Sequence, residues 1–137
     1  MRDPDTAARR SPPRLDAADK ATGRARYADD IRLPGMLHAA IHTSQQAHAR
    51  IVACRTDAAR ALPGVHAIVT GADIAGTRWG GIVKDETMLA RDKVRYVGEP
   101  IAAVAAIDAA TAIRAAAAIE VDYEPLPCML SPDAALA

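Results

Sequence analysis

The sequence is poor in aromatic residues, and this shortage limits both its core and its binding chemistry. Only 3% of the 137 residues are aromatic and phenylalanine is absent, so aliphatic side chains and alanine must build the core. Base-stacking surfaces need aromatic rings, which disfavours nucleic acid as a partner. The formal net charge is zero, so no basic excess draws the chain to nucleic acid or to an anionic membrane. We therefore expect neither as a partner.

Cysteines and long apolar runs are also scarce. Cys54 and Cys128 are far apart and in no metal-ligand spacing, which favours two buried thiols in a reducing compartment, with one disulfide as the alternative. No apolar run approaches the ~20 residues that span a bilayer. The N-terminus has no apolar stretch typical of a secretory signal. The expected location is the cytoplasm.

The length and composition are typical of one globular domain. Half of the residues are hydrophobic and 25% are charged, an ordinary balance for a folded chain. Residues 1–14 are polar, contain prolines and show no periodicity, which predicts a disordered N-terminal arm. Residues 15–137 should form the domain, which is long enough to bury a core.

The most regular stretch, residues 94–124, predicts a β-α-β unit. Pro100–Ile107 is an uncharged apolar run, typical of a strand that is buried on both faces. Asp108 can cap the helix that follows. That helix should bury a stripe with helical spacing, namely Ala109, Ala112, Ile113 and Ala116. A parallel pairing of the two strands would make the crossover right-handed. The predicted fold class is α/β (α+β) with a mixed sheet.

The second strand of this unit alternates between apolar and acidic side chains. Ile119, Val121 and Tyr123 should face inward, and Glu120, Asp122 and Glu124 outward. Prolines at 125 and 127 should end the strand, since proline cannot donate to a sheet. The acids could bind a hard cation, but a solvated sheet face is the favoured interpretation.

Shorter elements are expected elsewhere. A helical turn within residues 15–27 should be capped by Asp16 and ended by Gly23. Residues 36–43 and 50–56 should be strands that form an antiparallel pair, joined by a polar link. A short helix should begin at Asp57, and a strand at 65–70 should place Val65, Ala67 and Val69 on one face. A helix should begin at Ser131 with Pro132 in its first position, and a domain that ends at such a point looks truncated.

The histidines do not form an evident metal or catalytic site. His38 and His42 share a predicted strand face but lie roughly 13 Å apart, too far to bridge one zinc ion. His48 has no serine or cysteine nucleophile with an ordering carboxylate nearby, which favours a structural hydrogen bond over catalysis. His66 should be exposed. Glu99, at the mouth of the buried strand, is the most suggestive single carboxylate.

Residues 71–93 are the least regular segment and contain four glycines and the lone tryptophan, Trp79. Such a loop is typical of a functional or partner-facing surface. A phosphate site is weakly supported, because neither G-x-G-x-x-G nor the P-loop pattern occurs. The residues alone therefore predict an α/β domain with no self-contained active site.

The order of several motifs is familiar. The segments are Asp16–Gly23 (DAADKATG), 27–38 (YADDIRLPGMLH), 44–49 (SQQAHA), 63–74 (PGVHAIVTGADI), 84–90 (KDETMLA), 94–106 (VRYVGEPIAAVAA) and 121–127 (VDYEPLP). Together they resemble the N-terminal α/β hammerhead domain of the molybdopterin-binding large subunit in the xanthine dehydrogenase and aldehyde oxidase family. The resemblance runs in order from residue 16 to the end of the chain.

The resemblance implies a place in a molybdenum hydroxylase. The complete enzyme would bind a molybdenum–molybdopterin cofactor and add a water-derived oxygen to a heteroaromatic or aldehyde carbon. Its electrons would pass to iron–sulfur clusters and FAD on partner domains or subunits. The glycine-rich cofactor loops and the glutamate base belong to later domains of the family, so the resemblance assigns this chain no catalytic, cofactor or metal residue.

Two functions follow from the sequence. The first is a non-catalytic structural and assembly domain whose partners are the molybdopterin-binding, iron–sulfur and FAD domains or subunits. The alternative is a free-standing binding or protein-interaction module that reuses the fold. For the first function, the expected contact residues lie in the irregular segment and are Trp79, Lys84, Asp85 and Glu86.

Overall fold

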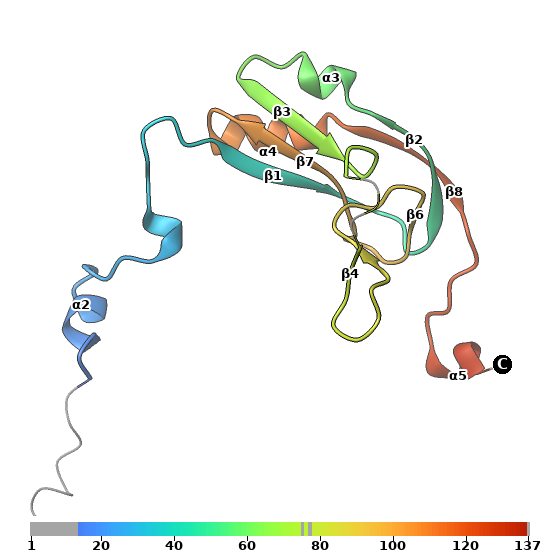
Figure 1. Cartoon of the computed structure of the whole chain (residues 1–137), viewed down its shortest axis with the longest axis horizontal. Helices are drawn as coiled ribbons and strands as arrows, with labels where there is room; N and C mark the ends of the chain where they lie inside the picture. The colour runs from blue at the N-terminus through green and yellow to red at the C-terminus, as the bar shows by residue number, and fades with distance from the viewer. Residues whose placement is uncertain (1–13, 75, 77, 137) are drawn as a thin grey trace, which may run out of the picture. The chain divides into compact units, whose positions relative to one another are not determined.

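The computed structural model describes residues 14–74, 76 and 78–136 (Figure 1). They belong to two compact units, one up to Pro34 and one from Gly35 onward. Of the predicted N-terminal arm, all but Arg14 lies outside the described residues.

The first unit contains the helix α2 (Ala17–Ala21) and the 3-10 turn η1 (Ala28–Asp30). Gly23 ends the predicted helical turn with a φ of 71°, as expected. Asp16 stands at the predicted N-cap position, but its carboxylate makes no cap hydrogen bond. The prediction of a side-chain cap is therefore wrong, because Asp16 pairs instead with Arg14 and with Lys20 at 2.8 Å.

The second unit is built from antiparallel sheets. One has the order β1 (His38–Thr43), β7 (Pro100–Ala106), β3 (Val65–Thr70), and another the order β6 (Lys93–Val94), β2 (Ala49–Arg55), β8 (Glu120–Pro125). A small hairpin pairs β4 (Arg78–Trp79) with β5 (Glu86–Thr87). The helices are α3 (Asp57–Arg60), α4 (Ala109–Ala117) and α5 (Pro132–Leu136). This content confirms the predicted α/β (α+β) class.

Strand β7 forms the centre of the first sheet, as its uncharged sequence predicts. Ala102 and Val104 pack with Ile68 of β3 and with Ala115 and Ala116 of α4 in one buried cluster. Ile101 joins a second cluster, together with Ala49, Ala90 and Val94. Both clusters consist of aliphatic side chains and alanine. Figure 1 shows α4 against this sheet, and the buried Ala115 and Ala116 are small enough to allow close packing there.

The strand–helix–strand order of 94–124 is present, but the two strands do not pair. β7 lies between β1 and β3, while β8 pairs with β2, and each of these pairings is antiparallel. The predicted mixed sheet is therefore wrong for the described residues. Both edges of β7 are already paired, with β1 and β3. The pairing of β8 with β2 is favoured by opposite charges, because Arg50 lies opposite Glu124 and Arg55 lies opposite Glu120.

The predicted pairing of 36–43 with 50–56 is also wrong. The strands exist as β1 and β2, but they belong to different sheets. The link between them begins at Ser44, which is fully buried and hydrogen-bonds the backbone of Gln46. The Ser44 backbone is also held by Gly98 and Glu99, at 2.8 and 2.9 Å. These long-range hydrogen bonds fix the start of the link, at the point where the chain leaves the sheet of β1.

The buried faces of α4 and β3 differ from the predicted ones. Helix α4 buries Thr111, Ala112, Ala115 and Ala116 and leaves Ala109 and Ile113 exposed. Asp108 caps the helix as predicted, through Thr111 N–H at 2.7 Å. In β3 a register shift between Val65 and Ala67 turns Ile68 inward, so Ala67 and Val69 are exposed. A bulge of this kind cannot be read from alternation alone.

Candidate partner-facing surface

Within the irregular segment, residues 78–87 form the β4–β5 hairpin, which gathers the four predicted contact residues. Trp79 lies opposite Glu86 in register, and Lys84 and Asp85 belong to the connecting tip. Gly80 begins the tip with a φ of 144°, a conformation that other residues rarely adopt. Their role as contact residues stays a prediction.

The hairpin exposes several large apolar side chains. Trp79 is 54% exposed, Ile82 is fully exposed, and Val83 and Met88 are largely exposed. Single exposed apolar residues are common, but a group of them on one short hairpin is typical of a surface that another molecule covers.

Beside the hairpin, a tight loop is closed by Glu99. The Glu99 side chain is only 6% exposed. It accepts hydrogen bonds from the backbone N–H of Arg95 and, at 3.1 Å, from the Arg95 guanidinium. Glu99, the most suggestive carboxylate of the sequence, therefore holds the loop that enters β7. The loop presents Tyr96 and Val97 to the outside.

Two hollows adjoin this loop, and Arg95 and Tyr96 line both of them. The first, of about 230 Å³, lies between the loop and the hairpin and is lined by Asp85, Glu86, Thr87 and Glu99. The second, of about 690 Å³, lies between the loop and the segment 127–130. Tyr96, Met129 and Leu130 were missed by sequence reasoning. The apolar run Cys128–Leu130 after Pro127 was the sequence feature that could have indicated this surface.

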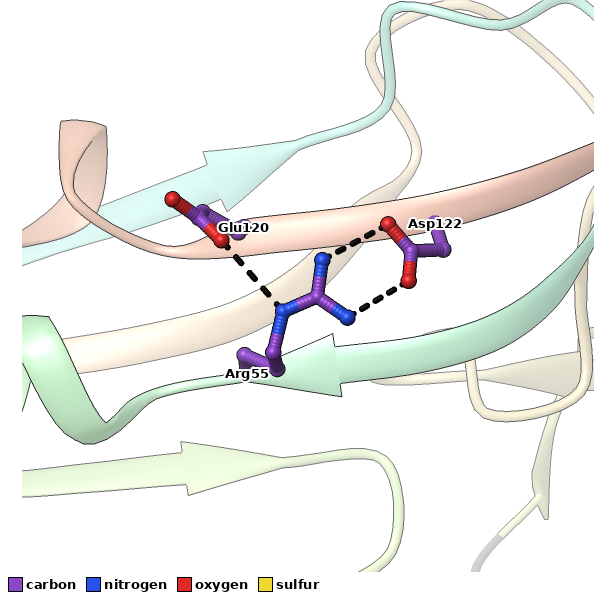
Figure 2. A network of polar contacts seen from close by, with 3 residues as sticks. All are labelled: Arg55, Glu120 and Asp122. Atoms are coloured by element: carbon purple, nitrogen blue, oxygen red, sulfur yellow. Dashed lines mark hydrogen bonds and ion pairs between the residues drawn. The ribbon is translucent and has the colours of Figure 1, made fainter.

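The acids of β8 form ion pairs on an exposed sheet face. Figure 2 shows the Arg55 guanidinium between Glu120, at 3.3 Å, and Asp122, which it contacts through two nitrogens. This guanidinium lowers the pKa of Asp122, and the two carboxylates raise the pKa of Arg55. Arg50 pairs with Glu124 at 3.3 Å. The solvated-face interpretation is supported over a cation site, because each of these acids already pairs with an arginine.

The histidines make structural contacts. His42 Nδ1 lies 2.8 Å from the carbonyl oxygen of Ala116, near the end of α4. His48 Nδ1 lies 2.6 Å from the carbonyl oxygen of Pro127, which agrees with the structural hydrogen bond expected for it. His66 is exposed as predicted.

The cysteines are both free, and neither is fully buried, although burial was predicted for both. Cys54 is half-buried on β2, and this burial raises the pKa of its thiol. Cys128 is exposed beside the larger hollow, so the prediction of two buried thiols is wrong for it. Cys128 follows Pro127, beyond the end of β8, where no sheet covers it.

The described residues contain no group of three or more His, Cys, Asp or Glu side chains placed to hold a metal ion. In the same part of the chain, no helix has the length and apolarity needed to cross a membrane.

Comparison with known proteins identifies the domain. A family model described as "Aldehyde oxidase and xanthine dehydrogenase, a/b hammerhead domain" matches residues 22–127. The chain is 40% identical over 136 residues to the xanthine dehydrogenase molybdenum-binding subunit of Escherichia coli, covering 90% of this chain and 18% of that protein. It is 40% identical over 117 residues to the carbon monoxide dehydrogenase large chain of Afipia carboxidovorans, covering 80% of this chain and 14% of that one.

Solved structures agree. The quinoline 2-oxidoreductase of Pseudomonas putida 86 superimposes with a TM-score of 0.82 at 41% identity, covering 90% of this chain and 17% of that chain. A Cu,Mo-carbon monoxide dehydrogenase superimposes with a TM-score of 0.84 at 38% identity, covering 89% and 16%. The chain thus spans about a sixth of the proteins it matches. It belongs to the aldehyde oxidase and xanthine dehydrogenase family, within the α/β hammerhead domain of that family.

Proposed function

We propose that this chain is a structural and assembly domain of a molybdenum hydroxylase. In this proposal the segment itself is not catalytic, and the complete enzyme hydroxylates a heteroaromatic or aldehyde carbon with water-derived oxygen. The observation that carries the proposal is the family match over residues 22–127, in relatives several times longer than this chain.

The cofactors are assigned to other parts of the assembly. The donor groups of the described residues do not cluster into a metal site, and Glu99, the most buried carboxylate, is already bonded to Arg95. The proposal therefore places molybdenum–molybdopterin in a separate molybdopterin-binding domain, and iron–sulfur clusters and FAD on further domains or subunits. Each of these is a proposed partner.

The exposed apolar residues support an assembly role. Trp79 and Ile82 on the hairpin, and Tyr96 and Leu130 at the larger hollow, would be covered in a larger protein. We propose that Trp79, Lys84, Asp85 and Glu86 contact the molybdopterin-binding domain.

The test is the molybdenum content and intact mass of the protein, purified at native abundance from its own source. The expected result is stoichiometric molybdenum, held in a much longer chain or in a tight complex with a second polypeptide. A stable, metal-free 14 kDa monomer without partners would contradict the proposal and favour the free-standing interaction module.

A further inference from the structure

We infer that the surface around Tyr96 binds a partner segment that carries a basic side chain next to an apolar one. This inference rests on the proposed assembly function and specifies the chemistry of its partner. The surface consists of the β4–β5 hairpin, the loop 95–99 and the segment 127–130, which meet at the two hollows that Arg95 and Tyr96 share.

The smaller hollow carries an excess of negative charge. Asp85, Glu86 and Glu99 line it, against the single cation of Arg95. Glu99 and Arg95 neutralise each other through their ion pair at 3.1 Å. Asp85 and Glu86 form no ion pair among the described residues, and the hollow thus has two uncompensated carboxylates. Charge complementarity favours a lysine or arginine as the occupant.

Thr87, which also lines this hollow, has a hydroxyl group without a hydrogen-bond partner among the described residues. Thr87 Oγ1 is buried, yet no group in the described part of the chain bonds it. A buried polar group left unpaired is costly, and native proteins satisfy nearly all of them. An oxygen with so little accessible surface is not reached by a group in the hollow as it stands, so the charge of Asp85 and Glu86, and not this hydroxyl, selects a basic side chain.

The larger hollow fits the apolar part of the segment. Val97, Met129 and Leu130 line it together with Tyr96, and each of these side chains is more than half exposed. Since Arg95 and Tyr96 line both hollows, one segment that passes over these two residues can place its basic side chain in one hollow and its apolar side chain in the other. The Glu99–Arg95 hydrogen bonds stabilise the loop itself and fill neither hollow.

Carboxyl labelling tests the inference in the assembled protein. The free 137-residue chain and the native molybdenum-containing assembly are treated with carbodiimide and glycine ethyl ester, and each carboxylate is quantified by mass spectrometry. We expect the labelling of Asp85 and Glu86 to fall at least about fivefold in the assembly. Equal labelling in free and assembled protein overturns this inference alone, whereas a chain that has no partner at all overturns the proposed function with it.

A paired charge variant and its control test the role of Asp85 and Glu86. We expect D85N/E86Q to weaken association with the partner about tenfold or more and to reduce its salt dependence. The control E120Q, on the face of β8, should change affinity by less than about twofold. An equal loss of affinity in E120Q, or an unchanged affinity and salt dependence in D85N/E86Q, contradicts the inference.

Discussion

At the scale of single residues, the tip of the β4–β5 hairpin depends on Gly80. Its φ of 144° is unfavourable for any residue with a Cβ, and a Cβ built there would overlap the carbonyl oxygen of Val83. The neighbouring Gly81 has open space around its Cβ position. The two adjacent glycines therefore provide a matched pair for testing the hairpin.

We predict that G80A opens the hairpin and that G81A does not. Trp79 is the only tryptophan in the chain, so its fluorescence reports on this hairpin alone. G80A should shift the Trp79 emission to the red and weaken association with the partner about tenfold, because the tip can no longer close. Indistinguishable spectra for wild type, G80A and G81A would show that the hairpin tolerates a side chain there.

The two cysteines should differ in reactivity. Cys128 is exposed, whereas burial raises the pKa of Cys54 and so reduces its thiolate at neutral pH. We predict that iodoacetamide at pH 8 modifies Cys128 at least about tenfold faster, measured by mass spectrometry with C128S as the control. Slow labelling of both residues that becomes fast after reduction would reveal a disulfide instead.

At the scale of elements, the start of α4 depends on its cap. The Asp108 carboxylate accepts hydrogen bonds from Thr111 N–H and from the Thr111 hydroxyl, and these bonds lower the pKa of Asp108. A lowered pKa in the folded state gives stability above the unfolded pKa of about 3.9, which is lost as the pH falls through the folded value.

We predict that D108A lowers the melting temperature by about 5 °C at pH 7. The difference from wild type should shrink as the pH falls below about 4, because the wild-type carboxylate then becomes protonated. D108N is the control, since asparagine caps a helix without titrating in this range. A difference that is constant from pH 7 to pH 3 would argue that the carboxylate charge plays no part.

At the scale of the whole molecule, the uncovered surface should affect the behaviour of the free chain. Met129 and Leu130 are exposed at the larger hollow, and Ile113 is similarly exposed on α4. We predict that M129S/L130S reduces binding of a hydrophobic dye to the free chain by about half, whereas I113S changes it little. Fluorescence titration measures the difference. An equal reduction in I113S would indicate that apolar exposure is not concentrated at the hollow.

Local patterns predicted the elements better than their pairing. The uncharged run that became β7 and the Asp108 cap are short-range features and were identified correctly. The partner of β8 depends on Arg50 and Arg55, some 70 residues earlier in the chain, and no local pattern contains that information. The buried face of α4 was ambiguous because alanine occupies most of its positions. The prediction placed the single isoleucine, Ile113, on the buried face, whereas in the structure Ile113 is exposed.

The candidate surface was predicted only in part for a similar reason. Trp79 and the charged residues after it were identified because the segment is irregular. The strands that bring them together have two residues each, which is too short for an alternating pattern. Tyr96 and Leu130 meet only through the folded loop and the segment after β8, so their common hollow has no signature in the sequence.

The antiparallel sheets also constrain when the chain can fold. β1, β2 and β3 are complete by residue 70, but the strands that pair with them, β7 and β8, begin at residues 100 and 120. Contacts between such distant segments slow folding, because a long loop must close before any pairing forms. During synthesis, the first half of the domain therefore emerges from the ribosome with unpaired edges and must wait for β7. In a cell, this interval is the time at which a chaperone would protect the chain.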